Sequence, residues 1–581
     1  RKTLLNKINK NFERGGKIEI ISTDGQEHFS DATLETLYNI DQKLNSFYIG
    51  NDSDYFIHEN LQEFLSQEKE RYIKNHILGD LTSILDGKLD NTTIIIAKAF
   101  DLVSSCIIEF LSTIEEFQKK LFTMKKKVVE SEYCLTIDNI DEKYYDEILK
   151  NKAQLIAWEN LFSFKVTSVA ELKAQPTLVL DTKFFRQQDG SNSFKDKILA
   201  EIDNLDERIN GLLINSENYQ ALTLLEEKYR GAIKCIYIDP PYNSKSTSII
   251  YKNFFKHSSW ASLMANRLVI GKKLLSPNGV LIVAIDENEQ ENLGQILSEQ
   301  FPAHEKTCVS VIHNPGGIQG DNFSYNHEYA YFVYPKGGKI IGLEAREIED
   351  ADVRPLRDVS KGDHLRIDAA NCFFPIYVKN QKVIGFGDVC ADDFHPSSAN
   401  VLRKDGIMEI YPIDAQGEER KWVFARQTVE SIKGELAVEF NKKRKVWDII
   451  RTKMMFNFKT VWDDKKYNAN SYGSKLLNNI IGEKKFSFPK SVYTVLDSVR
   501  AGSYQGEKGF VLDYFAGSGT TGHSVIKLNK EDDNFNLKYI LTEMGTYFEP
   551  VTKTRILKVI FSQKWKDMKP EDNDGSLKHI F

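Results

Sequence analysis

The sequence lacks an apolar run long enough to cross a membrane, and it lacks paired cysteines. No stretch of the 581 residues approaches the roughly 18 apolar residues of a membrane span, and no signal peptide pattern is visible. The six cysteines are scattered without a Cys-x-x-Cys pair, which argues against a zinc site or a disulfide framework. These absences favour a protein of the reducing cytoplasm, without a metal ion and without a membrane anchor.

The sequence also lacks a strong net charge. A formal charge of -6 is slightly acidic, but it does not exclude nucleic acid, because the footprint that binds nucleic acid is local. Hydrophobic residues make up 41% of the chain and charged residues 28%, as in ordinary folded proteins. The length predicts two to four domains.

The spacing of apolar residues and the local composition divide the chain into five segments. Residues 1–195 are expected to form a mainly helical N-terminal region. Strands and helices alternate over 196–335 and again over 456–565, so both segments are predicted to belong to one α/β domain. Residues 336–455 are richer in Gly, Asp and Pro and predict an inserted α+β domain. Residues 566–581 form a polar tail.

Two segments carry expectations about packing. Residues 95–122 predict an amphipathic helix, and we expect its apolar stripe to be core packing rather than a cofactor site. The residues of that stripe are Phe110, Leu111, Ile114, Phe117 and Leu121. The polar stretch 569–575 is expected to be disordered.

In the α/β segment, residues 308–313 and 329–334 are predicted to be a pair of strands. Their pattern indicates a mainly parallel sheet with an antiparallel element at its edge.

A short motif follows the apolar run 233–238, which predicts a buried strand. Asp239, Pro240, Pro241 and Tyr242 come next, and the two prolines end the strand in an extended turn. A carboxylate and an aromatic ring are thus held at the carboxyl end of a strand, where open α/β sheets bind ligands. This geometry suits a flat base that carries an amine.

A second motif lies at residues 509–521, which read Gly-Phe-Val-Leu-Asp-Tyr-Phe-Ala-Gly-Ser-Gly-Thr-Thr. It predicts a strand that ends at Asp513, a turn through Gly517 and Gly519, and the start of a helix. No Lys follows the glycines, so a P-loop is unfavoured. Gly522 supplies the third glycine of a dinucleotide fingerprint, so this motif alone leaves NAD binding open.

An acid at the end of the next strand supports a nucleoside site. Residues 539–542 predict a strand, and Glu543 follows it, 30 positions after Asp513. Rossmann-like sheets hold a ribose with such an acid at about 20 positions. The polar run 529–536 accounts for the longer spacing as a surface loop.

Together, Asp-Pro-Pro-Tyr and Phe-Ala-Gly-Ser-Gly-Thr-Thr resemble the motifs of S-adenosylmethionine-dependent amino-methyltransferases of DNA. The order of the motifs, catalytic first and glycine turn last, resembles the β class of that family. Over residues 205–562 the chain looks most like the modification (Mod) subunits of type III restriction-modification systems. The resemblance implies an α/β, Rossmann-like methyltransferase fold with circularly permuted motif order, in which residues 336–455 are the target-recognition domain.

The resemblance also assigns site residues. It implies that Asp239, Pro240, Pro241 and Tyr242 are catalytic. The residues implied to bind S-adenosylmethionine are Glu217, Asn218, Ser474, Lys475, Asp513, Phe515, Ala516, Gly517, Ser518, Gly519, Thr520 and Glu543.

Other residues are candidates for contacts with DNA. Trp260, Phe323 and Tyr325 are candidate neighbours of the target base, although ordinary packing is the favoured interpretation of each. The candidates for reading or holding DNA in the insert are Arg403, Arg420, Arg426, Asn380 and Gln381, with base and phosphate contacts equally open.

The implied reaction is methylation of N6 of an adenine flipped out of double-stranded DNA. Asp rather than Ser at position 239 favours N6 of adenine over N4 of cytosine, as the family usually shows. The resemblance further implies a homodimer. It leaves open whether a restriction subunit with helicase and nuclease activities is a partner.

Three rival functions remain open on the sequence. The chain could be a catalytically silent DNA-recognition subunit of a defence complex, although intact Asp239 and Tyr242 weigh against this. It could methylate amines of RNA or protein. A nicotinamide dehydrogenase is the weakest rival, because no acid or base that handles a hydride is evident.

Overall fold

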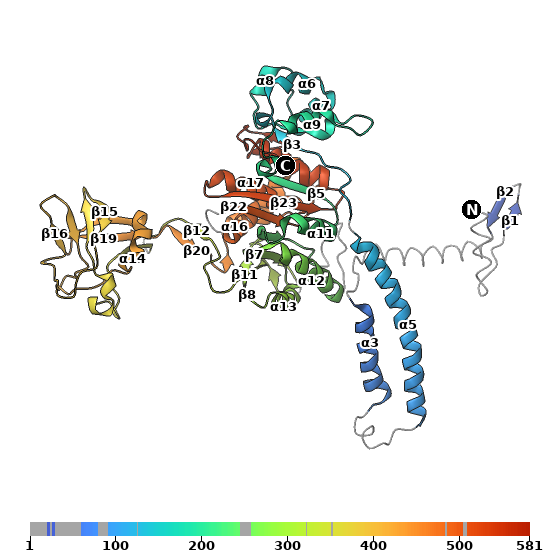
Figure 1. Ribbon diagram of the computed structural model, residues 1–581, viewed down its shortest axis with the longest axis horizontal. Coiled ribbons are helices and arrows are strands. Elements are labelled where there is room, and N and C mark those ends of the chain that lie inside the picture. Colours follow the sequence, from blue (N-terminus) through green and yellow to red (C-terminus); the bar gives the residue numbers. More distant parts are fainter. Residues whose placement is uncertain are drawn as a thin grey trace. The chain divides into compact units, whose positions relative to one another are not determined.

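The computed structural model describes most of the chain, as two compact units (Figure 1). One unit comprises Arg1–Ile340 with Thr460–Phe581, and the other comprises Ile341–Lys459. The described residues are 20–23, 26–29, 60–79, 91–124, 126–243, 257–320, 322–349, 352–482, 485–503 and 508–581.

An eight-stranded sheet organises the first unit. All its strands run in one direction except β11, which is antiparallel to both its neighbours. In spatial order the strands are β21 (Val461–Trp462), β8 (His304–Val311), β11 (Glu328–Pro335), β7 (Leu275–Ile285), β6 (Ile233–Ile238), β22 (Lys508–Asp513), β23 (Asn536–Glu543) and β5 (Gly211–Asn215).

The predicted pair of strands is confirmed as β8 and β11, but the expected place of the antiparallel strand is wrong. β11 lies inside the sheet, between β7 and β8. The sheet continues beyond the pair because β21, which follows the second unit in the chain, runs parallel to β8 and bonds to it. The edge strand on this side of the sheet is therefore β21, which the chain forms after the second unit.

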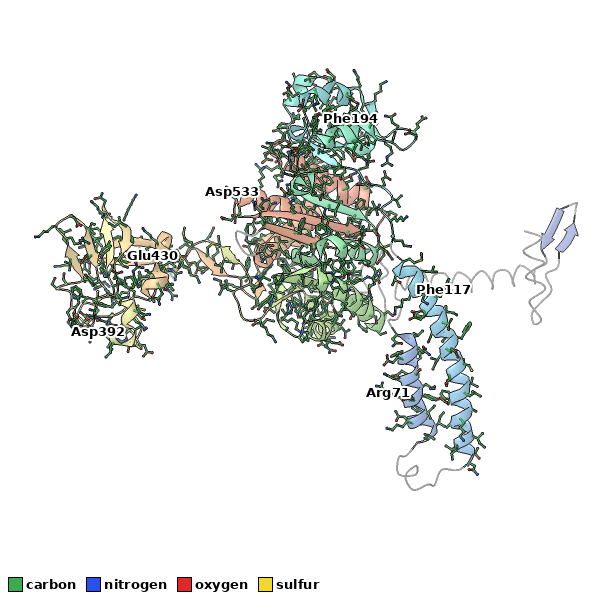
Figure 2. All side chains as sticks on the ribbon, in the orientation of Figure 1. Arg71, Phe117, Phe194, Asp392, Glu430 and Asp533 are labelled. Atoms are coloured by element: carbon green, nitrogen blue, oxygen red, sulfur yellow. The ribbon has the colours of Figure 1, made fainter. Side chains whose placement is uncertain are left out.

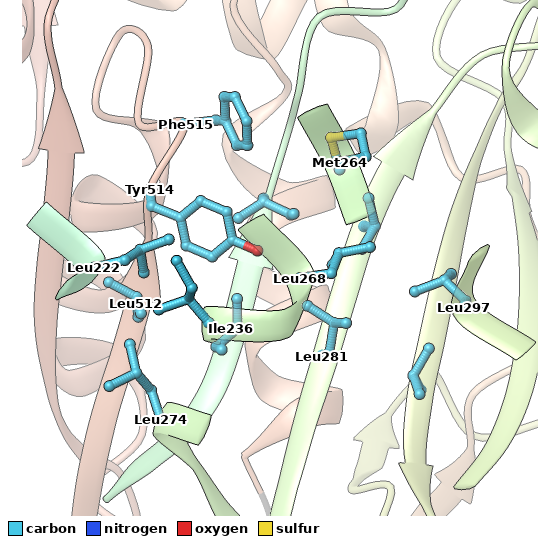
Figure 3. Close-up of a cluster of buried hydrophobic side chains, with 14 of the residues drawn as sticks. Leu222, Ile236, Met264, Leu268, Leu274, Leu281, Leu297, Leu512, Tyr514 and Phe515 are labelled. Carbon is cyan, nitrogen blue, oxygen red and sulfur yellow. The ribbon is translucent and has the colours of Figure 1, made fainter. Parts of the chain in front are cut away.

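Helices cover both faces of the sheet, because successive residues of a buried strand point to opposite sides. Ile236, Leu281 and Leu512 pack against Leu268 and Leu274 in one buried cluster (Figure 3). The helices of this cluster are α11 (Asn218–Tyr229), α12 (His257–Leu274) and α13 (Gln290–Gln300). The remaining helices of the α/β domain are α15 (Leu476–Ile481), α16 (Val492–Gly502), α17 (Thr520–Glu531) and α18 (Thr554–Phe561).

The N-terminal region contains two long helices, α3 (Leu61–Tyr72, continued by a π-turn to Ile77) and α5 (Asn91–Thr123) (Figure 1). They lie side by side, with Lys69 Nζ 2.6 Å from Asp101 Oδ1. Two paired antiparallel strands, β1 (Ile20–Thr23) and β2 (Gln26–Phe29), precede them. No helix of the described residues is long and apolar enough to span a membrane.

The helix predicted over residues 95–122 is confirmed, but the expected core packing of its stripe is wrong. Phe110 is 65% exposed and Phe117 is 63% exposed, and the other stripe residues are also exposed. The helical spacing identified one apolar face correctly, but it could not reveal that α3 packs on a different face of α5.

The segment after the long helices is small and mostly helical. Its strands β3 (Cys134–Thr136) and β4 (Val179–Asp181) pair with each other. Its helices are α6 (Tyr145–Lys150), α7 (Lys152–Phe162), α8 (Val169–Lys173), α9 (Ser193–Ala200) and α10 (Leu205–Arg208).

The C-terminal tail is ordered, so the expected disorder of residues 569–575 is wrong. β24 (Trp565–Lys566) and β25 (Lys569–Pro570) form a hairpin, and Gly575 N donates to Phe561 O at 3.0 Å. Beyond them, Cys134 N donates to Phe581 O at 2.8 Å, and Ile580 is fully buried. This pairing with β3, distant in sequence, anchors a tail whose own composition is polar.

The second unit has an α+β fold with short strands. Its core surrounds Trp422, whose Nε1 donates to Phe374 O at 2.8 Å. The strands are β12 (Leu343–Ala345) with β20 (Met455–Asn457), then β13 (Val353–Pro355), β19 (Val446–Thr452) and β18 (Leu436–Asn441), and finally β15 (Lys382–Phe386), β14 (Ile376–Lys379), β17 (Met408–Ile410) and β16 (Asn400–Leu402). The helix α14 spans Arg426–Val429.

Candidate functional site

The two sequence motifs meet because β6 and β22 are neighbours in the sheet. Leu512 of β22 lies opposite Ile236 of β6 in parallel register. Asp239 follows β6 directly, and Asp513 ends β22. Since carboxyl ends of parallel strands share one edge, Asp-Pro-Pro-Tyr and the glycine turn lie side by side although they are far apart in sequence.

These motifs line a pocket of about 850 Å³, counted to its open mouth. Its lining combines acids, rings and the glycine turn: Asp239, Asp513 and Glu543; Tyr237, Tyr242, Phe486, Phe488, Phe515 and Tyr547; Pro240, Pro241, Ser487, Pro489, Lys490, Val495, Ala516, Gly517, Ser518, Thr520 and Thr521.

A cluster of charged groups surrounds Asp239. Lys490 Nζ lies 3.5 Å from Asp239 Oδ1 and donates to Glu328 Oε2 and to the Tyr242 hydroxyl. The Tyr242 hydroxyl in turn donates to Glu328 Oε2 at 3.2 Å. The side chains of Glu328 and Lys490 are 6% and 11% exposed, whereas that of Asp239 is 26% exposed. Of the three charged side chains, that of Asp239 is therefore the most exposed.

The pKa shifts divide the roles of these acids. Burial raises the pKa of Asp239, and the neighbouring Lys490 offsets this only in part. Burial also acts to raise the pKa of Glu328, but Lys490, together with His313 and the Tyr242 hydroxyl, outweighs it, and the net pKa shift is downward. Lys490 and Glu328 thus form the tight ion pair, and Asp239 retains the basic, less compensated carboxylate.

Two buried contacts hold the loop that carries the motif. Trp260 is fully buried, and its Nε1 donates to Pro241 O at 2.7 Å. Glu289, also fully buried, accepts from Asn243 Nδ2 at 2.6 Å and pairs with His257 Nδ1 at 2.8 Å. Trp260 therefore supports the loop from the core, as the packing interpretation expects.

Asp513 and Glu543 hold the backbone of the glycine turn. Asp513 accepts from Phe515 N at 2.9 Å and from the Thr521 hydroxyl. Glu543 Oε2 accepts from Gly517 N at 2.9 Å, at a residue whose φ of +52° lies in the left-handed region. Burial raises the pKa of Asp513 to about 7, since neutral donors compensate its charge only in part. These hydrogen bonds tie the turn to the ends of β22 and β23 beside the pocket.

Five predicted cofactor residues do not line this pocket: Gly519, which lies within the glycine turn itself, and four residues of other segments. Glu217 caps α11 and pairs with Arg267 Nη2 at 2.6 Å, and Asn218 accepts from Arg267 Nε at 2.8 Å. Ser474 and Lys475 lie in a π-helical turn, Asn470–Lys475.

That π-helical turn supports the tract that carries Lys490. A Cβ on Gly473 would lie 2.2 Å from Pro489 O, so the turn packs directly on the tract. Ser474 and Lys475 thus belong to a turn that packs behind the lining tract.

The arginines proposed to contact DNA lie in the second unit, and two are engaged within it. Arg420 Nε is 2.7 Å from Asp414 Oδ2, and Arg426 Nε donates to Gly387 O at 2.6 Å. The Arg403 side chain also has acidic neighbours, Asp405 Oδ2 at 3.2 Å and Glu409 Oε1 at 3.7 Å, but it is 43% exposed. Asn380 and Gln381 form the left-handed turn between β14 and β15.

The three aromatic residues predicted as candidate neighbours of the target base differ in their exposure. Phe323 is 77% exposed and Tyr325 is 44% exposed, beside and within the short hairpin of β9 (Ile318–Gln319) and β10 (Ser324–Tyr325). Trp260, in contrast, is buried beneath the catalytic loop.

Sequence reasoning missed Glu328, Glu289 and the contact of Lys490 with Asp239. Glu328 begins a strand that is otherwise apolar, and it is 5% exposed. A carboxylate at the start of a buried strand was the available signal, because burying a charge is costly without a partner.

Comparison with known proteins gives a consistent family. A family described as DNA methylase matches residues 233–554. The EcoPI Mod subunit of a type III restriction-modification enzyme from Escherichia phage P1 is 26% identical over 375 residues, 55% of this chain and 55% of that protein. The type II methyltransferase M.KpnI of Klebsiella pneumoniae is 27% identical over 364 residues, 58% of this chain and 81% of that protein. The chain thus spans about half the length of the Mod subunit that it matches.

Among solved structures, the M1.HpyAVI–SAM complex aligns with 60% of this chain and 98% of its own, at 11% identity and a TM-score of 0.28.

Proposed function

Because the chain belongs to the DNA methylase family, we propose that it transfers a methyl group from S-adenosylmethionine to N6 of adenine at specific sites in double-stranded DNA. The observation that carries the proposal is the adjacency of β6 and β22. It brings an acid and a ring suited to an amine-bearing base into one pocket with a glycine turn suited to a nucleoside.

The chemistry of the pocket fits S-adenosylmethionine, which carries a positive sulfonium. Asp239, Asp513 and Glu543 line the pocket, and Lys490 is the single cation among its described lining residues. Phe486 and Tyr547 pack edge to face, with centroids 5.1 Å apart, and supply apolar wall for an adenine ring.

Within this pocket, Glu543 at the end of β23 is the natural partner of the ribose hydroxyls. When bound, the cofactor supplies the electrophilic methyl group.

Asp239 would prepare the amine of the target base. The exocyclic amine of adenine is a poor nucleophile, because its lone pair is delocalised into the ring. Hydrogen bonds from the amine to the Asp239 carboxylate and the Pro240 carbonyl would favour the pyramidal form that attacks. The raised pKa of Asp239 also suits this carboxylate to take the proton that the amine loses.

Tyr242 would hold the flipped base. Extrusion of a base costs a few kcal/mol, and stacking on an aromatic ring returns roughly 1–3 kcal/mol. Glu328 and Lys490 bind the Tyr242 hydroxyl and so fix the plane of the ring before the base arrives. The choice of adenine over cytosine rests on Asp rather than Ser at position 239.

We assign target recognition to Ile341–Lys459. This unit is compact, has its own core and interrupts the α/β domain without contributing a strand to the large sheet. Exchange of this unit with that of a relative should change the methylated sequence. If the methylated DNA sequence does not change, target recognition lies in the other unit. The resemblance to type III Mod subunits supports a restriction subunit as partner.

Single-molecule sequencing of DNA from methylation-free cells that express this chain alone tests the proposal directly. We expect N6-methyladenine at one defined sequence and none in cells that express Asp239→Ala. N4-methylcytosine would contradict the choice of base. Absence of any DNA methylation, with S-adenosylmethionine still bound by the purified chain, would favour the silent DNA-recognition subunit. Methyl transfer to RNA or protein but not to DNA would contradict the proposal that DNA is the substrate.

A further inference from the structure

Helix α5 carries a strict heptad seam. Large apolar residues recur with alternating spacings of four and three from residue 96 to residue 121, over more than three heptads. They are Ile96, Phe100, Val103, Ile107, Phe110, Ile114, Phe117 and Leu121. This period of 3.5 is typical of coiled coils, whereas a helix that packs on a globular core shows a broader stripe of period 3.6.

The seam does not face α3. The residues of α5 directed at α3 are mostly small or polar: Ser112 is 6% exposed, and Ser105 Oγ accepts from Lys69 Nζ at 3.0 Å. Ser105, Ile108 and Ser112 occupy the heptad positions opposite the seam. The face of α5 that contacts α3 is thus the face opposite the seam.

Almost the whole seam is exposed. Phe100 stacks on Tyr72 of α3, with ring centroids 5.1 Å apart. The other seam residues are 42–65% exposed, including Phe117, which Figure 2 labels on α5. An apolar surface of this extent on a folded chain marks an interaction site.

We propose that this seam pairs with the seam of a second copy of the chain, so that two α5 helices form a coiled coil with α3 on the outside of each. The seam is regular along its length, so two copies interlock with the same knobs and holes. Such a contact is isologous and closes at two chains.

The residues that flank the seam favour a second copy over a different helix. Charges at these positions usually select the partner and its orientation in coiled coils. Between Ile96 and Leu121 the flanking residues are uncharged apart from Lys120: Ala97, Ala99, Ser104, Cys106, Leu111, Thr113 and Gln118. Identical copies therefore meet without repulsion, and the usual device for choosing another partner is missing.

The seam is also large enough to form a stable dimer interface. A helix of 33 residues is about 50 Å long. Stable specific interfaces bury roughly 800 Å² on each partner. Two exposed phenylalanines at roughly 150 Å² each, with five exposed aliphatic side chains, reach that order.

Sedimentation velocity of the full chain tests the proposal. The seam variant Ile107→Glu/Ile114→Glu places two charges in the middle of the seam. The matched control Ile95→Glu/Leu102→Glu makes equivalent changes on the same helix, outside the seam, at residues that are 65% and 68% exposed. Because all four side chains are exposed, both variants should keep the wild-type circular dichroism spectrum.

We expect a dimer for the wild type and the control at micromolar concentration, and at least a 100-fold weaker dimer for the seam variant. A wild-type monomer would overturn the proposal, because another segment of the chain or a different protein would then be the occupant. A dimer that survives equally in both variants would also overturn it, since the copies would then associate through another surface. These outcomes do not depend on the proposed methyl transfer, which is measured separately.

Discussion

The pocket of the large sheet and the second unit use charged side chains in opposite ways. At the wall of the pocket, the ammonium of Lys490 is shared by two carboxylates, the lining residue Asp239 and the buried Glu328 behind it. In the second unit, a single guanidinium has more than one partner: Arg420 lies 2.7 Å from Asp414 and 3.6 Å from Glu418. The pocket has an excess of acid over base, whereas Arg420 in the second unit has an excess of acidic partners.

This difference separates groups that act from groups that support the fold. A carboxylate that is under-compensated and open to a cavity is free to bind an amine, and its raised pKa is typical of functional sites. An arginine that is saturated by internal partners stabilises its own unit and has little left for DNA. The predictions below test this distinction, from the largest expected effect to the smallest.

Asp239→Ala should reduce methyl transfer by about 1,000-fold or more, because the amine loses the acceptor of its proton. Cofactor affinity, measured by calorimetry, should change by less than about threefold, since Glu543 and the glycine turn are untouched. Transfer of labelled methyl groups to plasmid DNA measures the rate. A rate near that of the wild type would show that this carboxylate is not the acting group.

Asp513 should make the sheet unit less stable as the pH rises. Its pKa is about 7 when folded, against an ordinary value of 3.8, so folding retains a proton between these values. The associated stability is complete below pH 3.8 and is lost as the pH rises through 7. Between pH 5 and pH 8, the wild type should lose about 3 kcal/mol relative to Asp513→Asn, which cannot ionise.

Urea denaturation of both proteins at the two pH values checks this prediction. Parallel pH dependence of the wild type and Asp513→Asn would contradict it, and would mean that the buried carboxylate is compensated after all.

Lys490→Met should cost about 3 kcal/mol of unfolding free energy, because it leaves Glu328 buried without its cation. Addition of Glu328→Gln should restore much of this loss, as a double-mutant cycle would report. Lys490 lowers the pKa of Asp239, so the acidic limb of the rate against pH should move to higher pH in Lys490→Met.

Lys475→Met is the matched control for this change, because Lys475 is exposed and lies outside the pocket. If the pH profile shifts equally in both lysine variants, Lys490 has no specific effect on the pKa of Asp239.

The arginines of the second unit should give the smallest effects. Arg403→Ala should weaken DNA binding several-fold and reduce its salt dependence, as expected for loss of one phosphate contact. Arg420→Ala should instead lower the stability of the unit, because Asp414 loses its partner, and leave the affinity of the folded protein nearly unchanged. Fluorescence anisotropy at two salt concentrations compares them. Equal losses of affinity would end the distinction between the exposed Arg403 and the largely buried Arg420.

The parts of the site that sequence reasoning found are those built from neighbouring residues. Asp239 follows a buried strand, and Asp513 precedes a glycine turn, so a local pattern predicted both strand ends. The contact of Lys490 with Glu328 was not predictable in this way. It joins the start of β11 to a tract that follows the second unit, and the strand order alone brings them together.

The two apolar patterns of the chain differ in the same respect. The run 233–238 predicted a buried strand, and all six residues are buried. The stripe on α5 predicted a helix correctly but predicted burial wrongly. Periodicity fixes which side chains share a face, because it follows from backbone geometry within one element. It does not fix what covers that face.

By itself, the sequence determined the strands and helices, the two motifs and the chemistry that each motif offers. Local backbone preferences and short-range spacing are sufficient for these. The tertiary structure alone decided that β6 and β22 are neighbours, that Lys490 reaches Asp239, that the tail is ordered against β3 and that the α5 seam faces outward. Those outcomes depend on contacts between residues distant along the chain, which are set by how whole elements bury their surfaces together.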